Sequence, residues 1–382
     1  MVGFLLLFGW VLLMFGIAWL WWRYRRPQMQ ERELPPELLA SMAQAAKTQT
    51  GKGSAAPEKW TPPPPRALPD ALASFKWHKE GDLPRPHVEK LLSAVKGIPR
   101  PPRAMQKLIS PGFLQTASSS DLAELLMKEP VIAAKVLATV NSPAYGLRQP
   151  IAGLGQAITF LGMNTVRSIC LQSMLNEAFK AGLAESQATF DAIWRATAVA
   201  SDLASRLGKA LKVPDLGELS TQVIFSFVGE LAFASLLPAE QRERWLRTKS
   251  LPRLKMEQDV MGFTTAEFGG LLLKEWEVPA ELSAKVVHTG RIVVTPADKA
   301  SPAMAPRMAV AYLSQVLARR LALGHLSSLR EYDIGQDDSP EMHHLRDYLH
   351  HPQLQGLSEL LASEDIHSAA ERLASNPGSA SI

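Results

Sequence analysis

Two polar side chains interrupt an apolar run near the middle of the chain. The run is VIFSFVGELAF, residues 223–233, and its polar side chains are those of Ser226 and Glu230. Because they are four residues apart, they would share one face of a helix. A hydroxyl and a carboxylate placed in this way can be part of an active site, or hydrogen-bonded groups within an ordinary core helix.

A second group of chemically active side chains lies near the C-terminus, in EMHHLRDYLHH. On a helix, His343, Asp347 and His350 would fall on one face, and imidazole and carboxylate groups are good transition-metal ligands. Nothing nearby supplies the outer hydrogen-bond partners that such ligands usually need. We therefore expect a solvated polar face here, and we assign neither a metal nor a cofactor to the chain.

The composition suits a globular chain with a membrane component, because 46% of the 382 residues are apolar and 20% are charged. The formal charge of +4 is too mild to indicate nucleic-acid binding. The single cysteine, Cys170, lies in the apolar run VRSICLQSML and cannot form an intrachain disulfide. We expect it to be a buried, inert thiol.

Residues 4–22, FLLLFGWVLLMFGIAWLWW, predict a transmembrane helix. They contain no charge and would form a helix of ~28 Å, about the thickness of the hydrocarbon core. Tryptophans near its end and arginines after it follow the pattern of a membrane interface with a cytoplasmic flank: Trp19, Trp21, Trp22, Arg23, Arg25 and Arg26. A cleaved signal peptide would carry its charge before the apolar core and small residues at its end. We therefore expect an uncleaved anchor, with residues 1–3 outside the cytoplasm and the rest inside.

Residues 23–86 are rich in Pro, Gly, Ser and Thr, and they include a four-proline run at 62–65. Such a segment buries too little apolar surface to offset chain entropy, so it is predicted to be a flexible linker with a polyproline II stretch. The patches ELPPELLASMAQAAK and DALASFKWHK could form short helices. The proline run could also bind an SH3-like partner, but a tether is the simpler interpretation.

The rest of the chain shows apolar residues at helical spacing, with few alternating runs typical of strands. This predicts an all-α fold, with a main domain over 87–300 and a helical C-terminal extension over 301–382 that ends in a disordered tail. In the most specific part, residues 128–171, an acidic-Pro dipeptide opens a helix and NSPAYG ends it. A second helix ends at Gly162, and a third begins at Thr165 and includes Arg167.

This stretch resembles the HDOD family, the HD-related output domains of bacterial signalling proteins, and the resemblance runs from about Ile98 to Thr295. The residues that carry it also have ordinary structural uses in ending helices and packing, and we interpret them chiefly in that way. They are Asn141, Ser142, Pro143, Tyr145, Gly146, Gly162, Arg167, Gly269, Trp276 and Pro279.

HD-superfamily hydrolases hold metal ions through an early His, an adjacent His-Asp pair and a late Asp, and the metals generate hydroxide for phosphate hydrolysis. The resemblance places Ala196, Ser226, Phe227 and Gln315 at these positions, with the assignment of Gln315 the least secure. A methyl group and a phenyl ring cannot bind a divalent cation. We therefore predict that the metal site is lost, that the chain is not an enzyme, and that Phe227 fills the vacated space.

Nearby departures agree with this interpretation. Thr265 stands where the family often has His, and His288 stands alone where some members have a His pair. We expect Glu230 to reach solvent or an arginine, because an unpaired buried carboxylate is costly. The stretch around Glu230 is also long enough for a second membrane span, but its polar residues favour a buried core helix.

The resemblance implies a non-catalytic, membrane-anchored regulatory or scaffold module of the bacterial inner membrane that acts through contacts with other signalling proteins, with no nucleic-acid partner. Two alternatives remain. One is a sensor that binds a small molecule such as a cyclic nucleotide in the vestigial pocket. The other is a metal-dependent phosphohydrolase, which would need intact ligands.

Overall fold

The computed structural model describes residues 60–145, 147, 149–179 and 187–375. The predicted anchor, the first part of the linker, Gly146 and the predicted tail from 376 on lie outside these residues.

Every regular element in the described part of the chain is helical, so the predicted all-α fold is confirmed. The α-helices are α3 (Asp70–Ala73), α4 (Arg85–Lys96), α5 (Arg103–Ile109), α6 (Pro111–Thr116), α7 (Ser119–Met127), α8 (Pro130–Val140), α9 (Leu154–Leu161), α10 (Met163–Phe179), α11 (Gln187–Ala210), α12 (Leu216–Phe225), α13 (Val228–Leu236), α14 (Ala239–Arg247), α15 (Ser250–Met261), α16 (Thr265–Glu275), α17 (Ala280–Arg291), α18 (Ala305–Ala322), α19 (Leu345–Tyr348), α20 (Leu357–Ala362) and α21 (Glu364–Ser375). Short 3-10 turns join them: η1 (Glu80–Asp82), η2 (Pro143–Tyr145), η4 (Ile292–Val294), η5 (Ala297–Lys299), η6 (Pro340–Met342) and η7 (Pro352–Leu354).

Local sequence signals explain several helix ends. A capping box starts α7, in which the Ser118 hydroxyl accepts from the Asp121 N–H and the Asp121 carboxylate accepts from the Ser118 N–H. Pro130 occupies the first turn of α8, where its missing N–H costs nothing. Gly162 ends α9 with a φ of 82°, a conformation that glycine adopts without strain. The predicted start of α8 and end of α9 are therefore confirmed, whereas α10 begins at Met163, two residues before the predicted Thr165.

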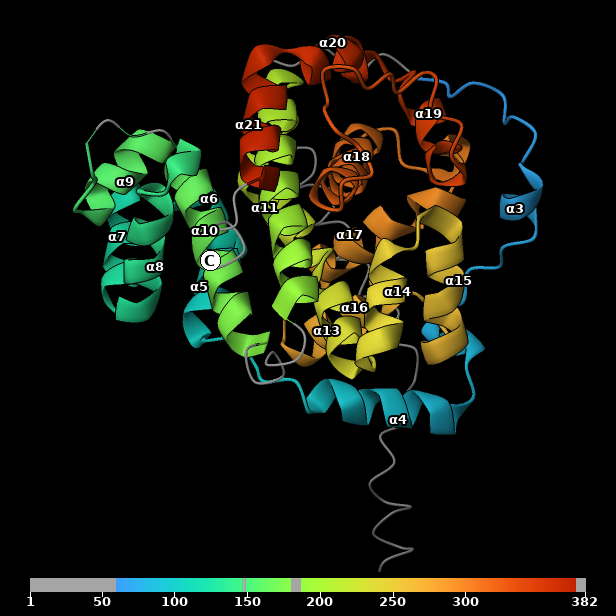
Figure 1. Ribbon diagram of the computed structural model, residues 1–382, viewed down its shortest axis with the longest axis horizontal. Helices are drawn as coiled ribbons and strands as arrows, with labels where there is room; N and C mark the ends of the chain where they lie inside the picture. Colours follow the sequence, from blue (N-terminus) through green and yellow to red (C-terminus); the bar gives the residue numbers. More distant parts are fainter. Residues whose placement is uncertain (1–59, 146, 148, 180–186, 376–382) are drawn as a thin grey trace, which may run out of the picture. The chain divides into compact units, whose positions relative to one another are not determined.

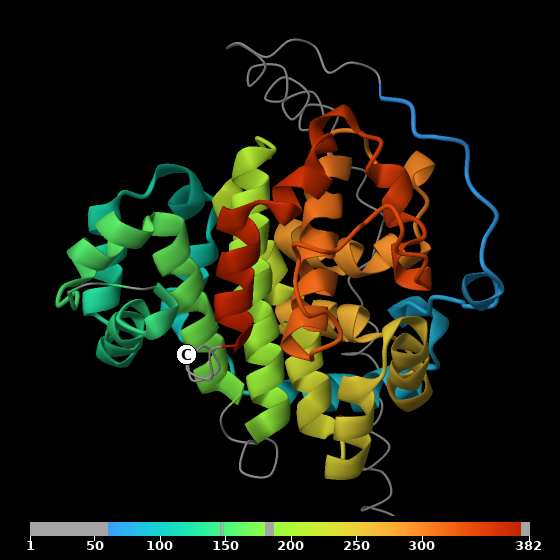
Figure 2. The same ribbon diagram turned by 45° about the horizontal axis from the view of Figure 1, so that its top comes forward.

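The long helix α11 lies at the centre of the domain. It packs against α18 and α12, and α21 lies along it (Figure 1). Helices α7, α8 and α9 form a separate group on the far side of α10, as both ribbon views show (Figures 1 and 2). Cys170 is fully buried in α10, and burial raises the pKa of its thiol far above the ordinary value. The predicted burial of this thiol is confirmed.

Helices α12 and α13 contain the apolar run that was long enough for a second membrane span. Within the described residues, Leu216–Leu236 is the one stretch with the length and hydropathy to cross a membrane, and 89% of its apolar window is buried. The chain turns at Ser226 and Phe227 between the two helices. Burial inside a helical domain is the behaviour of a core element, as the sequence predicted.

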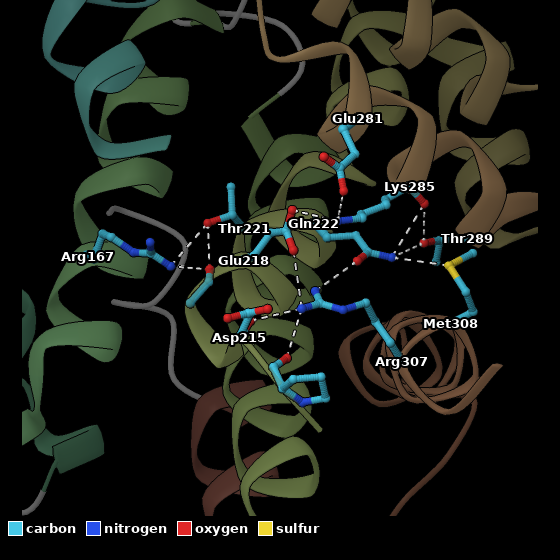
Figure 3. Close-up of polar contacts among 12 residues, drawn as sticks. Arg167, Asp215, Glu218, Thr221, Gln222, Glu281, Lys285, Thr289, Arg307 and Met308 are labelled. Carbon is cyan, nitrogen blue, oxygen red and sulfur yellow. Dashed lines mark hydrogen bonds and ion pairs between the residues drawn. The ribbon is translucent and has the colours of Figure 1, made fainter. Parts of the chain in front are cut away.

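Polar side chains on α12 tie this apolar run to its neighbours (Figure 3). The Gln222 amide donates to Thr289 of α17 at 2.8 Å, and Arg307 of α18 donates to the carbonyl of Pro214 at 2.8 Å. On the opposite side, Arg167 of α10 donates to the hydroxyl of Thr221 at 3.2 Å and to a backbone carbonyl (Figure 3). Because buried polar groups need partners, these bonds fix the rotation of α12 in the core.

Residues 60–79, which we call the strap, were predicted to be part of the flexible linker, and the structure corrects this. Leu72 and Phe75 are in the core, with relative exposures of 4% and 9%. The Trp77 indole donates to Glu267 at 2.6 Å, and Arg66 forms a 2.9 Å ion pair with Asp347. The sequence did not reveal the strap, because it is rich in proline and its few large side chains are spaced too irregularly to show a helical or strand period. In the second of the two patches α3 is helical, and the first patch lies outside the described residues.

Residues 301–375, which were predicted to be an extension, pack closely against the main domain. Helix α18 is part of the core, and the Gln353 amide donates to the carbonyl of Leu211 at the end of α11 at 3.0 Å. The segment EMHHLRDYLHH is not one continuous helix, because η6, a turn and the short α19 divide it. Asp347 is buried and paired with Arg66, and His344 is buried as well, so the expected solvated face is wrong. That expectation was wrong because it assumed one continuous helix through this segment.

Candidate functional site

A cavity of about 300 Å³ lies where the turn between α12 and α13 meets α15, α16 and α18. Ser226 and Glu230, the polar pair of the sequence analysis, both line it, and so does Gln315. Thr265 and Trp77 complete part of the wall. Of the four residues that the sequence placed at the vacated metal site, Ser226 and Gln315 line this cavity, whereas Ala196 and Phe227 do not.

The four vestigial positions are all buried. Their relative exposures are 2% for Ala196, 8% for Ser226, 0% for Phe227 and 8% for Gln315. The Gln315 amide donates to the Ser226 carbonyl at 3.3 Å, and the Ser226 hydroxyl donates to the Val223 carbonyl at 2.6 Å. The hydroxyl is thus already bonded within its own helix.

These four side chains do not fit a divalent cation. They offer a methyl group, a phenyl ring, a bonded hydroxyl and an amide, where metal ions in hydrolases require imidazole and carboxylate groups. In the described part of the chain, no group of three or more His, Cys, Asp or Glu side chains is placed to hold a metal ion.

Glu230 lines the cavity together with Ser226 and Gln315. It is 2% exposed, pairs with Arg253 at 3.2 Å, and also forms an ion pair with Arg319. Burial opposes ionisation of this carboxyl, but the two guanidinium groups outweigh it and hold its pKa below the ordinary value. The predicted arginine partner is therefore present, and two arginines share the role.

Arg253 is itself held from several sides. Its Nε donates to Glu257 at 3.1 Å, and its guanidinium lies 4.8 Å from the ring centroid of Trp245. Glu257 in turn accepts from the Trp245 indole at 2.9 Å and from the Thr265 N–H at 2.8 Å, so its carboxylate sits at the N-terminus of α16. Burial lowers the pKa of Arg253, but Glu230 and Glu257 outweigh this effect and raise it.

A second basic group closes another part of the cavity wall. Arg320 pairs with Asp337 and Glu341, and its Nη2 donates to the Ser339 hydroxyl at 2.8 Å. Burial of Asp337 is outweighed by hydrogen bonds from Ser339, Tyr332 and Arg320, which lower its pKa to about 2. This group ties the loop after α18 to the cavity.

Two glycines let α13 and α16 approach each other beside the cavity. A Cβ at Gly229 would lie 1.8 Å from the Thr265 carbonyl oxygen, and a Cβ at Gly269 would lie 3.2 Å from the Gly229 Cα. No L side chain fits at Gly229 without a backbone shift, and a Cβ at Gly269 would crowd the α13 backbone. The family motif residue Gly269 therefore has a packing role, which the sequence interpretation expected of the motif in general.

Asn141 shows how the motif closes a loop. At the end of α8, its amide donates to the carbonyls of Leu137 and Ile151, both at 2.8 Å, and its Oδ1 accepts from the Ile151 N–H at 2.7 Å. Its side chain therefore replaces a turn of backbone bonding across the ten residues to Ile151. Ser142 and Pro143 follow, and Pro143 opens η2.

Other motif residues also have structural partners. Arg167 is 2% exposed, and burial lowers its pKa to about 10. Trp276 is buried with its ring 6.0 Å from that of Phe179, and Pro279 precedes the first turn of α17. Tyr145 packs against the core, and burial raises the pKa of its hydroxyl.

Sequence reasoning missed the basic side chains of the cavity. Arg253 is far from the motif in sequence, and no local pattern marks it. Arg319 lies one helical turn after Gln315, so the proposed alignment of α18 could have indicated it. His288 is exposed and does not line this cavity, and partial burial of its ring and Arg291 lower its pKa. It lines a separate groove between α16 and α17.

The geometry can be compared with known proteins. The HDOD domain family matches residues 98–291, about half of the chain. A "putative phosphohydrolase" from Shewanella amazonensis SB2B is 20% identical with a TM-score of 0.52, over 74% of this chain and 96% of that one. An HDOD domain protein with unknown function from Geobacter sulfurreducens is 18% identical with a TM-score of 0.52, over 75% of this chain and 99% of that one.

A "putative signal transduction protein" from Marinobacter aquaeolei VT8 is 17% identical with a TM-score of 0.47, over 76% of this chain and 69% of that one. None of the curated proteins matches the chain. At these identities the solved structures establish the fold alone, and the family match covers the helices that carry Asn141, Arg167 and Gly269. On this match, the chain belongs to the HDOD family.

Proposed function

We propose that the chain is a non-catalytic HDOD module that regulates bacterial signal transduction through contacts with other proteins. The observation that carries the proposal is the vestigial site, where Phe227 is fully buried and Ala196 presents a methyl group. The carboxylate that remains, Glu230, is neutralised by Arg253 and Arg319. To bind the Glu230 carboxylate, a divalent cation would have to displace both guanidinium groups. Each arginine would then be left as a charge without its partner in a desolvated site, which is unfavourable.

Purified protein is expected to hold no stoichiometric Mn, Fe, Zn or Mg, and to leave phosphodiesters intact in the presence of these metals. The measurements are elemental analysis and hydrolysis of bis-p-nitrophenyl phosphate. About one tightly held ion per chain, or metal-dependent turnover, would overturn the non-catalytic role.

The four histidines of residues 341–351 are the control for this experiment. Replacing His343, His344, His350 and His351 by Ala should remove any adventitious metal. A stoichiometric ion that survives the replacement would count against the proposal.

We also propose that residues 4–22 anchor the chain in the bacterial inner membrane, with the domain in the cytoplasm. The charge-free run and the arginines after it support this orientation. The full-length chain should stay with the membrane fraction through an alkaline carbonate wash. A C-terminal reporter that is active only in the periplasm would contradict the orientation.

A further inference from the structure

Two arginines that line the cavity each have a buried donor atom without an acceptor among the described residues. Arg253 is 4% exposed, lines the cavity, and its Nη1 has no hydrogen-bond partner among the described residues. The Nε of Arg319, which lines the same cavity, is buried and equally without a partner in that part of the chain. Leaving charged donors unbonded is costly, so an exception of this kind needs an explanation. An acceptor that enters the cavity would supply it.

The N-terminus of α16 adds backbone donors to the same wall. Thr265 and Ala266 line the cavity, and the cap residue Thr264 makes no side-chain capping bond. The Thr265 N–H is taken by Glu257, but those of Ala266 and Glu267 have no acceptor within the described residues. The first turn of a helix favours negative charge and presents N–H groups to it.

The charges of the wall are largely balanced among themselves. Four basic side chains face three acidic ones: Lys249, Arg253, Arg319 and Arg320 against Glu230, Asp337 and Glu341. Each of the three carboxylates is already paired with an arginine. Lys249 is exposed, lies beside the cavity, and has no ion-pair partner in the described part of the chain. Glu257, which is paired with Arg253 just behind the wall, adds a fourth carboxylate, so the charges balance and what remains is a set of unused donors.

We propose that this cavity binds a small phosphate-bearing molecule, with the phosphate on Arg253, Arg319 and the first turn of α16 and with Lys249 beside it. Phosphate offers several acceptor oxygens, and guanidinium groups match its geometry. The volume of about 300 Å³ is at the lower end of the range for drug-sized ligands, so it suits a mononucleotide or a sugar phosphate. The guanidinium groups supply the positive charge that metal ions supply in a hydrolase. They do not supply the nucleophile that metal-bound water provides there, so binding would occur without hydrolysis.

This inference adds a ligand to the non-catalytic role and gives the strap a part in it. Trp77 lines the cavity and is bonded to Glu267 in the first turn of α16. A ligand would therefore touch the segment that leads directly to the N-terminal part of the chain.

The test is thermal unfolding and isothermal titration calorimetry of the full-length chain with inorganic phosphate, AMP or glycerol 3-phosphate. Adenosine and sodium chloride of equal ionic strength are the phosphate-free references. At least one of the three phosphates should raise the melting temperature, since a ligand that binds the folded state stabilises it, and the references should not. If none of them raises it above the chloride reference, the ligand site is refuted while the non-catalytic role still stands.

The matched variants are Lys249→Glu and Lys255→Glu. Both reverse one exposed lysine near or within α15, but Lys255 does not line the cavity. Reversing a charge close to a bound phosphate should weaken the affinity by about tenfold or more. Lys255→Glu should bind as the wild type does. Unchanged affinity in Lys249→Glu, or equal losses in both variants, would overturn the proposed site.

Discussion

Phe227→Ala is expected to lower the free energy of unfolding by about 3–5 kcal/mol, the range for a large buried aromatic side chain. Phe227 is fully buried at the turn between α12 and α13, and the Arg319 guanidinium lies 5.8 Å from its ring centroid. Removing the ring would leave a cavity in the core. The surrounding helices are held in place by ion pairs, so they cannot move together to fill it. Urea denaturation of the purified chain measures the effect.

The matched control is Phe160→Ala, because Phe160 is 57% exposed and the same atoms are removed. It should cost less than about 1 kcal/mol. Phe227→Asp should be worse than Phe227→Ala, because it adds a buried carboxylate and the nearest guanidinium, that of Arg319, is already paired with Glu230. Near-wild-type stability for Phe227→Asp would show that this position faces water, and would contradict the packed-core interpretation.

Gly229→Ala should destabilise the domain by at least about 3 kcal/mol, at or above the usual cost of overpacking. The added Cβ would lie 1.8 Å from the Thr265 carbonyl oxygen and 2.8 Å from the Gly269 nitrogen. Both are backbone atoms, so no side-chain rotation can relieve the clash, and α13 would have to move away from α16. A thermal melt of the variant beside the wild type measures the loss.

Gly155→Ala makes the same chemical change where a Cβ meets nothing within 4 Å. Gly155 lies in the first turn of α9, so this substitution should leave stability unchanged or raise it by up to about 1 kcal/mol. If Gly229→Ala were as stable as Gly155→Ala, the close crossing of α13 and α16 would be refuted.

Helix boundaries near the motif could be predicted because local signals fix them. A proline opens α8, Asn141 ends it, and Gly162 takes the positive φ that ends α9. These residues act on their own backbone, so their effect is readable from a short window of sequence. The burial of Phe227 and the arginine partner of Glu230 followed from the cost of the alternatives rather than from any pattern.

The rest of the site depends on contacts between segments far apart in sequence. Arg253 reaches Glu230 from another helix, and Trp77 reaches Glu267 across 190 positions. Neither pairing leaves a periodic trace in the sequence. The same is true of Asp347, whose partner Arg66 lies next to a proline run. Composition therefore assigned the strap to a linker, and an assumed helical spacing assigned the Asp347 segment to solvent.

The strap changes where an independently folding fragment can begin. Composition suggests a cut before residue 87, but such a fragment would lose Leu72 and Phe75 from the core and would leave Asp347 buried without Arg66. It would also open the wall that Trp77 closes. A fragment that starts at Trp60 keeps all of these contacts and the ring contact of Trp60 with His351, so we expect the autonomous unit to begin within the strap and not at residue 87.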